Sequence, residues 1–70
     1  MTQRTVGRDL TMGDRVVAFT PDADAIVTDT VEMEHGGLML SLDIYARDGA
    51  ECEGQTFFIV NPEAAYDVLR

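Results

Sequence analysis

Cysteine and histidine are the side chains with the widest chemistry, and this chain has one of each. Cys52 lies between Glu51 and Glu53, whose negative charges disfavour the thiolate that a nucleophile requires. A single cysteine excludes an internal disulfide, and one Cys with one His cannot form a zinc site made only of sulfur and nitrogen ligands. We therefore expect no catalytic role for Cys52 and no bound cofactor.

His35 is the second candidate, because it follows Glu32 and Glu34 and could share a metal ion with them. The two residues after it are glycines, which are typical of a tight turn, so solvated turn residues explain the same pattern. The acidic pair at positions 22 and 24 lacks the glycine and the terminal glutamate of an EF-hand calcium loop. With no phosphate loop and no nucleophile elbow in the sequence either, we expect no metal site and no enzyme.

Short β-strands must position these side chains. The clearest strand covers residues 38–45, where every second residue is aliphatic, as in a strand with one buried face. Its aliphatic residues are Leu38, Leu40, Leu42 and Ile44. Further strands are predicted at residues 14–19, 26–33 and 56–60, and turns at residues 20–24, 35–37 and 47–50. Because Phe57 and Phe58 are adjacent, one of them must lie outside the core face.

Asp29 breaks the pattern of the second strand. With regular pairing across the glycine turn, Val27, Val31 and Met33 share the inward face with the leucines, and Asp29 falls between them. A buried carboxylate without a partner is costly. We therefore favour a β-bulge that turns Asp29 outward, or a place at an open end, over a salt bridge with an arginine.

The opposite face of the second and third strands mixes apolar and short polar side chains. Tyrosine and methionine are enriched at protein interfaces, so this face suits contact with another protein or with a second copy of the chain. The alternative is that a terminal segment covers it. The candidate contact residues are Ile26, Thr28, Thr30, Met39, Asp43 and Tyr45. The unpaired edges of a small sheet also favour a homodimer formed by strand pairing.

The two ends of the chain carry weaker signals. Residues 1–9 show little apolar periodicity and predict a flexible tail, which leaves residues 10–70 as a single small β domain. Residues 61–63 read Asn-Pro-Glu, which is typical of a helix start and predicts a short helix over residues 62–69. The alternative is a 3₁₀ turn there, followed by a last strand over residues 66–69.

One segment resembles a known family. Leu10-Thr11-Met12-Gly13-Asp14-Arg15-Val16 is similar to the Leu-x-x-Gly-Asp-x-Val segment that leads into the first strand of many SH3-like small barrels. Together with the strand pattern, the expected fold class is mainly β: a four- to five-stranded antiparallel meander curling into an SH3-like barrel or half-barrel, with a short C-terminal helix. Such barrels host peptide binders, nucleic-acid binders and spacers, so the resemblance implies a fold and no single function.

The balance of acidic and basic residues limits the classes of molecule that this chain can bind. The chain has 13 acidic residues against 5 basic ones, all arginine, and a net charge of −8. This lysine-free composition resembles those of small proteins from haloarchaea or from other organisms with high-GC genomes. The phosphates of a nucleic acid would repel the acidic side chains, which disfavours direct nucleic-acid binding. No apolar stretch is long enough to span a bilayer and no signal peptide is recognisable, so we expect a cytoplasmic protein with no membrane partner.

These observations favour a non-enzymatic, protein-binding or self-associating small acidic β module. An alternative is an acidic mimic of nucleic acid that blocks the basic groove of a DNA- or RNA-binding protein. Its phosphate-like carboxylates would be Asp22, Asp24, Asp43, Asp48, Glu51 and Glu53. A further alternative is a small-ligand or metal-binding barrel that uses His35.

Overall fold

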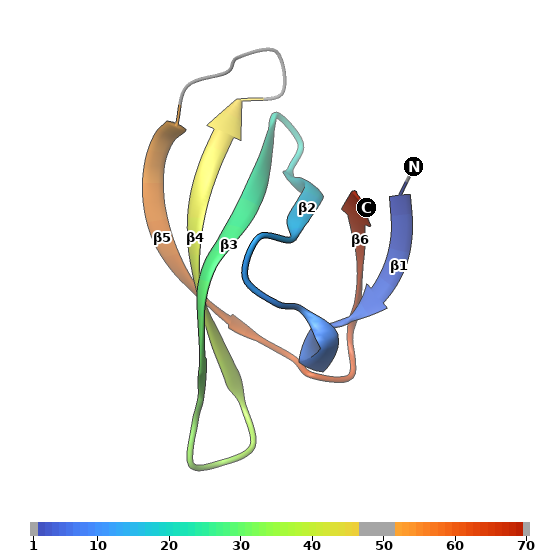
Figure 1. Ribbon diagram of the computed structural model, residues 1–70, viewed down its shortest axis with the longest axis vertical. Helices are drawn as coiled ribbons and strands as arrows, with labels where there is room; N and C mark the ends of the chain where they lie inside the picture. Colours follow the sequence, from blue (N-terminus) through green and yellow to red (C-terminus); the bar gives the residue numbers. More distant parts are fainter. Residues whose placement is uncertain (1, 47–51, 70) are drawn as a thin grey trace.

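The computed structural model describes residues 2–46 and 52–69, which form six strands and one short 3₁₀ helix (Figure 1). The elements are β1 (Thr2–Val6), η1 (Gly7–Asp9), β2 (Arg15–Thr20), β3 (Ala23–Glu32), β4 (Leu38–Ala46), β5 (Cys52–Val60) and β6 (Ala65–Leu69). The predicted turn at residues 47–50 lies outside the described residues.

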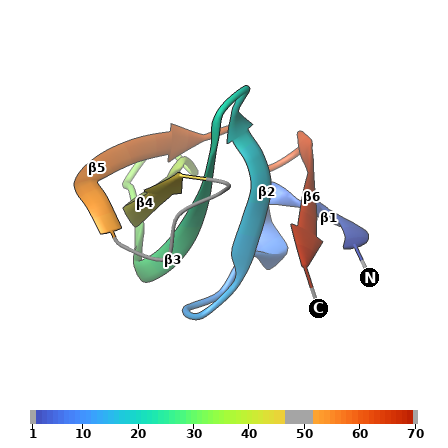
Figure 2. The same cartoon turned by 90° about the horizontal axis from the view of Figure 1, so that it is seen from above.

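All six strands join one antiparallel sheet in the order β1-β6-β2-β3-β4-β5. β2 to β5 are neighbours in chain order, whereas β6 returns to lie between β1 and β2. The sheet curls, as the view from above shows (Figure 2), but β1 and β5 remain its two edges. The mainly antiparallel β class is thus confirmed, with six strands in the described chain instead of four or five, and the sheet is not closed into a barrel.

The concave side of the sheet holds the core. Its buried side chains come from the loop before β2 and from every strand except β1; they are Leu10, Val16, Ala25, Val27, Leu40, Leu42, Val60 and Val68. Phe58 of β5 packs edge to face against Phe19 of β2 and Tyr66 of β6, with ring centroids 5.1 and 6.4 Å apart. Because β5 is paired with neither β2 nor β6, these aromatic contacts hold the curled sheet together from the inside.

β4 shows the predicted alternation. Leu40 and Leu42 are fully buried, and Leu38 and Ile44 are half-buried against the same core. The alternate aliphatic side chains therefore line the concave side, as the sequence pattern predicts.

The predicted glycine turn closes the hairpin between β3 and β4. Gly36 has a φ of +81°, a conformation that glycine adopts without a steric penalty. The Met33 N–H donates to the Gly37 carbonyl, and the Gly36 N–H donates back to the Met33 carbonyl. This short loop sets the register in which the two long strands begin to pair.

Residues 10–16, which resemble the segment that leads into the first strand of SH3-like barrels, form a turn that is hydrogen-bonded to β3. Asp14 Oδ2 accepts a hydrogen bond from the Thr11 N–H at 3.0 Å. Gly13 has a φ of +91°, and its N–H donates to the Val27 carbonyl at 2.8 Å, while the Val27 N–H donates to the Asp14 carbonyl at 2.9 Å. The Gly-Asp pair therefore fixes where the chain enters β2 relative to β3.

Both ends of the chain differ from expectation. Residues 2–9, expected to be a flexible tail, form β1 and η1, and β1 pairs with β6 along its whole length. Residues 65–69 are a strand, so the predicted C-terminal helix is wrong and the alternative of a last strand is the better description. Asn61 Oδ1 does accept from the Glu63 N–H at 2.9 Å, but this cap closes a turn. β1 and β2 bond β6 from both sides, whereas a helix this short is unstable alone.

Candidate functional site

A β-bulge in the middle of β3 decides which of its residues face outward. The β4 partners of Val27 and Asp29 are consecutive residues, so Thr28 is the extra residue of the bulge. The Thr28 hydroxyl donates to the Ser41 carbonyl at 3.1 Å, and the exposed Asp29 carboxylate accepts from the Thr30 N–H at 2.9 Å. The expected bulge that turns Asp29 outward is therefore confirmed.

The bulge also exchanges the faces of the residues that follow it. Thr30 lies opposite Leu40 and shares its concave face. Val31 lies opposite Met39, faces outward and is 45% exposed, and Met33 is exposed as well. The prediction that Val31 and Met33 face inward is wrong, because one inserted residue reverses the alternation of everything beyond it.

Exposed apolar side chains gather on the convex face where β3, β4 and β5 lie side by side (Figure 1). Val31, Met39 and Ile59 lie opposite one another in a single row across the three strands. Phe57 precedes Ile59 by two residues on β5 and faces the same way. Phe57 is 71% exposed and Ile59 is 64% exposed. We call Val31, Phe57 and Ile59, together with the half-buried Met39, the outer apolar patch.

Four of the six predicted contact residues lie on this convex face of β3 and β4. They are Ile26, Met39, Asp43 and Tyr45. Thr28 is exposed at the bulge, whereas Thr30 is half-buried on the concave side. The structure thus keeps most of the predicted set on one face and removes Thr30 from it.

Sequence reasoning missed the contribution of β5 to this face. The adjacent aromatics do divide as predicted, with Phe58 half-buried in the core and Phe57 exposed. The same alternation puts Val60 inside and Ile59 outside, a pattern visible in the sequence. The predicted meander does place residues 56–60 beside residues 38–45. What the sequence does not show is the register that brings Phe57 and Ile59 next to Met39.

A polar cluster borders the convex face at the start of β3. The buried Asp24 carboxylate accepts a hydrogen bond from the Arg15 Nε at 3.1 Å and from the Ala18 N–H at 2.8 Å. The Arg15 guanidinium also lies 6.0 Å from the centre of the Tyr45 ring. Nearby on β4, Asp43 Oδ1 is buried and has no hydrogen-bond partner among the described residues. Arg15 therefore pairs with the buried Asp24 carboxylate and lies near the Tyr45 ring.

β5 is a long edge strand with little protection. Within the described chain it pairs only with β4, and Glu53 is the one charged residue among its nine. Residues 54–62 form the longest run without a charged side chain in the whole sequence. Natural edge strands are commonly kept short or carry charges, because exposed backbone groups pair readily with other chains.

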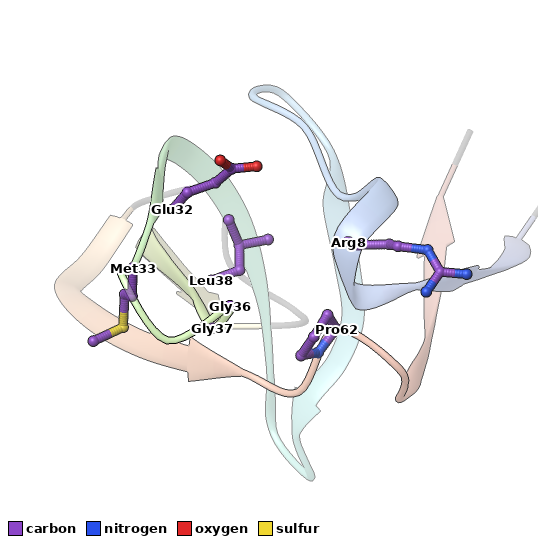
Figure 3. Close-up of a pocket in the computed structure, with 7 residues that line it drawn as sticks. All are labelled: Arg8, Glu32, Met33, Gly36, Gly37, Leu38 and Pro62. Carbon is purple, nitrogen blue, oxygen red and sulfur yellow. The ribbon is translucent and has the colours of Figure 1, made fainter.

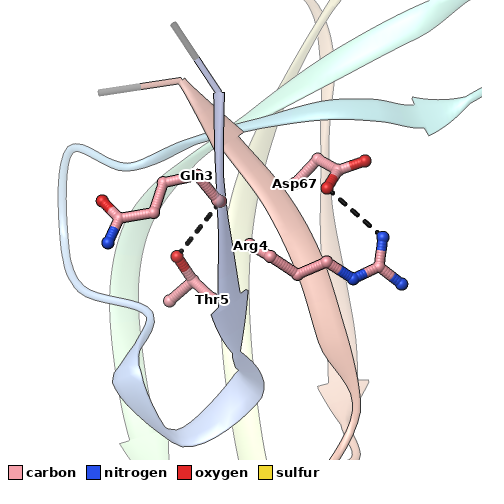
Figure 4. Close-up of polar contacts among 4 residues, drawn as sticks. All are labelled: Gln3, Arg4, Thr5 and Asp67. Atoms are coloured by element: carbon pink, nitrogen blue, oxygen red, sulfur yellow. Dashed lines mark hydrogen bonds and ion pairs between the residues drawn. The ribbon is translucent and has the colours of Figure 1, made fainter.

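The opposite edge, β1, follows that rule. It has only five residues, of which the first three are exposed and polar. Its exposed Arg4 donates from Nη1 to the Asp67 Oδ1 at 3.4 Å, and the Thr5 hydroxyl donates to the Gln3 carbonyl at 3.3 Å (Figure 4). The two edges of one sheet therefore differ sharply in length, charge and apolar surface.

A small pocket lies between the β3–β4 hairpin and Pro62 (Figure 3). Its volume is about 190 Å³, and Glu32 and Leu38 point into it from the hairpin, whereas the Arg8 guanidinium points away. Sites for small molecules commonly measure about 300–1,000 Å³. Arg8 is also paired with Glu63 at 2.9 Å. This pocket is a weaker candidate site than the outer apolar patch.

His35 and Cys52 do not form a common site. His35 is exposed in the turn before β4, and Cys52 is exposed beside the far end of β4, with its thiol 3.2 Å from the Gly54 carbonyl oxygen. Among residues 2–46 and 52–69, no group of three or more His, Cys, Asp and Glu side chains is arranged to hold a metal ion.

The described part of the chain has no helix with the length and apolarity needed to cross a membrane. Comparison with protein-family models, with curated proteins and with solved structures finds no match to this chain. The function must therefore be argued from the outer apolar patch and from the β5 edge.

Proposed function

We propose that this protein is a non-enzymatic binding module: a small acidic β domain of the SH3-like type that contacts another protein chain through the outer apolar patch. The observation that carries the proposal is the exposure of Phe57 and Ile59 on the same face as Val31 and Met39, with Ile59 in one row with them. Grouped exposed apolar side chains mark interaction sites more often than isolated ones do. The anchored Gly-Asp turn before β2 supports the SH3-like part of the proposal.

The surroundings of the patch fit an interface with an apolar centre and a polar rim. Ser41, whose partner on β5 is Phe57, has Asp29 as its partner on β3, and Asp43 follows it by two residues on β4, so negative charge borders the patch. Tyr45 extends the rim, with the Arg15 guanidinium 6.0 Å from the centre of its ring. Covering one large apolar side chain contributes about 1.5–3 kcal/mol. A different protein that covers the whole patch would present apolar side chains at its centre and basic ones at its border.

Capture of proteins from a native lysate by three forms of the chain tests the proposal. Ile59→Lys places a charge in the patch, and Met12→Lys places the same charge at a methionine that is 66% exposed in the turn before β2. We expect partners that bind the original chain and Met12→Lys, in dilute and in molar salt, and that Ile59→Lys fails to bind. Equal capture by all three forms would contradict the proposal.

Mimicry of nucleic acid is the second candidate, and the net charge of −8 favours it. Of its carboxylates, however, Asp24 is engaged by Arg15 and Asp43 is half-buried. Asp48 and Glu51 lie outside the described residues. Ion-pair binding is screened by salt. A partner that is released in molar salt and is indifferent to Ile59→Lys would favour mimicry over the apolar patch.

A further inference from the structure

We propose that the β5 edge pairs with the β5 edge of a second copy of this chain, antiparallel and around a two-fold axis. The inference rests on the proposed function, because it names the partner that meets the outer apolar patch at its edge. The two curled sheets then continue into one another through the backbone hydrogen bonds of β5.

The backbone of β5 supplies the first reason. In the described chain β5 is bonded on one side only, so alternate residues direct their N–H and C=O groups away from the sheet. The strand is nine residues long and contains no proline, and both its one charged side chain and the irregularity in its pairing with β4 lie at its start, at Glu53. These are the properties of a strand that accepts a further strand.

The uncharged β5 edge suits a second copy of this acidic chain as its partner. Each chain carries a net charge of −8, so two copies repel one another unless they meet at a neutral surface. Residues 54–62, which carry no charge, cover most of β5 and the turn that follows it. A basic partner would be attracted more strongly to the acidic surface elsewhere on the molecule than to this uncharged edge.

Glu53 sets the orientation of the pair. Parallel pairing would place the two Glu53 side chains side by side. In antiparallel pairing with Phe57 on the two-fold axis, each Glu53 lies opposite Asn61 of the second copy. The two Glu53 positions are then separated by eight residues along the edge, about 27 Å. This distance exceeds the Debye length of about 8 Å at physiological salt, so their repulsion is screened.

The same arrangement covers the exposed side chains of β5. Residues directly opposite each other in an antiparallel pair share a face, so Phe57 meets Phe57 of the second copy, and Ile59 meets its Gln55. The outer apolar patches of the two copies become continuous across the axis. Pairing therefore hides part of Phe57 and Ile59, whose exposed fractions are 71% and 64% in the single chain.

The test measures the molar mass of the full chain by light scattering and sedimentation from low to high micromolar concentration. We expect the mass to rise toward twice the 7.7 kDa of one chain. Phe57→Lys places a charge on the axis and should raise the Kd of the dimer by at least about tenfold. Because Phe57 is exposed, this variant should keep the circular dichroism spectrum of the original chain.

Two matched variants separate the β5 edge from other contacts. Met12→Lys changes the exposed turn before β2, outside the outer apolar patch, and Gln3→Lys changes the opposite edge. We expect both to remain dimeric. A monomer at every concentration overturns the inference, and so does a dimer that Met12→Lys or Gln3→Lys disrupts as strongly as Phe57→Lys does.

The outcome is distinguishable from that of the proposed function. A monomer that still captures a different protein through Ile59 overturns the inference and leaves the proposed function standing. A dimer that depends on Phe57 but captures no other protein supports the inference and removes the wider binding role.

Discussion

Asp24 is an acidic side chain buried in the sheet and satisfied by its neighbours. One carboxylate oxygen faces the Arg15 Nε, and the other accepts from the N–H of Ala18, whose φ of +56° is uncommon for a residue other than glycine. The pairing of β2 with β3 is irregular between Val16 and Thr20. The carboxylate therefore stabilises a strained stretch of β2 as well as the charge of Arg15.

Asp24→Ala should lower the free energy of unfolding by about 2–4 kcal/mol, because it removes the acceptor of the partly buried Arg15 guanidinium and of the Ala18 N–H. Asp24→Asn should cost less, since its amide oxygen can still accept from the Ala18 N–H. Urea denaturation measures both changes. The control is Asp22→Ala at the exposed turn, which should stay within about 0.5 kcal/mol. Equal losses at the two positions would show that Asp24 has no special role.

At the scale of the element, the bulge of β3 is a single inserted residue. Deleting Thr28 keeps every pair on both sides of it, so Asp29 still faces outward and Val31 still faces Met39. We expect the deletion to fold, with a loss of about 1–2 kcal/mol from changed strand twist. Thermal unfolding gives the loss, and cross-strand nuclear Overhauser effects between Val31 and Met39 check the pairing.

Deleting Thr30 is the matched control for that experiment. It either brings the Asp29 carboxylate opposite Leu40 in the core or shifts the pairing of the whole hairpin end. This variant should be far less stable than the Thr28 deletion. If the two deletions behave alike, the bulge is not the feature that sets the faces of β3.

At the scale of the whole molecule, the net charge of −8 opposes folding in dilute buffer. The ion pairs Arg4–Asp67 and Arg8–Glu63 are exposed and offset little of this repulsion. Raising salt shortens the Debye length from about 10 Å at 0.1 M to about 3 Å at 1 M. We expect potassium chloride over this range to raise the stability by about 1 kcal/mol. Urea midpoints measure the change, and a midpoint that falls with salt would contradict this view.

The strands with one buried face could be predicted from their own residues. In β4 the leucines at alternate positions need a dry face wherever the strand lies, so its orientation follows from periodicity alone. The Gly36 turn was also local, because a positive φ value and a short hydrogen-bonded loop involve only neighbouring residues. The bulge was expected from Asp29, since a lone carboxylate on an apolar face is costly.

The effect of the bulge on the residues beyond it was not predicted. The position of the inserted residue, Thr28, depends on the partner strand, so the outward placement of Val31 could not be read from β3 alone. The prediction of a C-terminal helix was wrong for a related reason. Asn61 does cap the backbone, as predicted, but whether a turn or a helix follows depends on the space between β1 and β2 that β6 fills.

The amino-acid sequence by itself determined the β class, the aliphatic face of β4, the acidic surface and the absence of charge at residues 54–62, because composition and short-range periodicity belong to the chain whatever its fold. Only the tertiary structure decided that this uncharged segment lies at a sheet edge and that Phe57 and Ile59 join Val31 and Met39 on one face. The physical reason is that strand neighbours and bulge positions are set by hydrogen bonds between residues far apart in the chain, which no local pattern encodes.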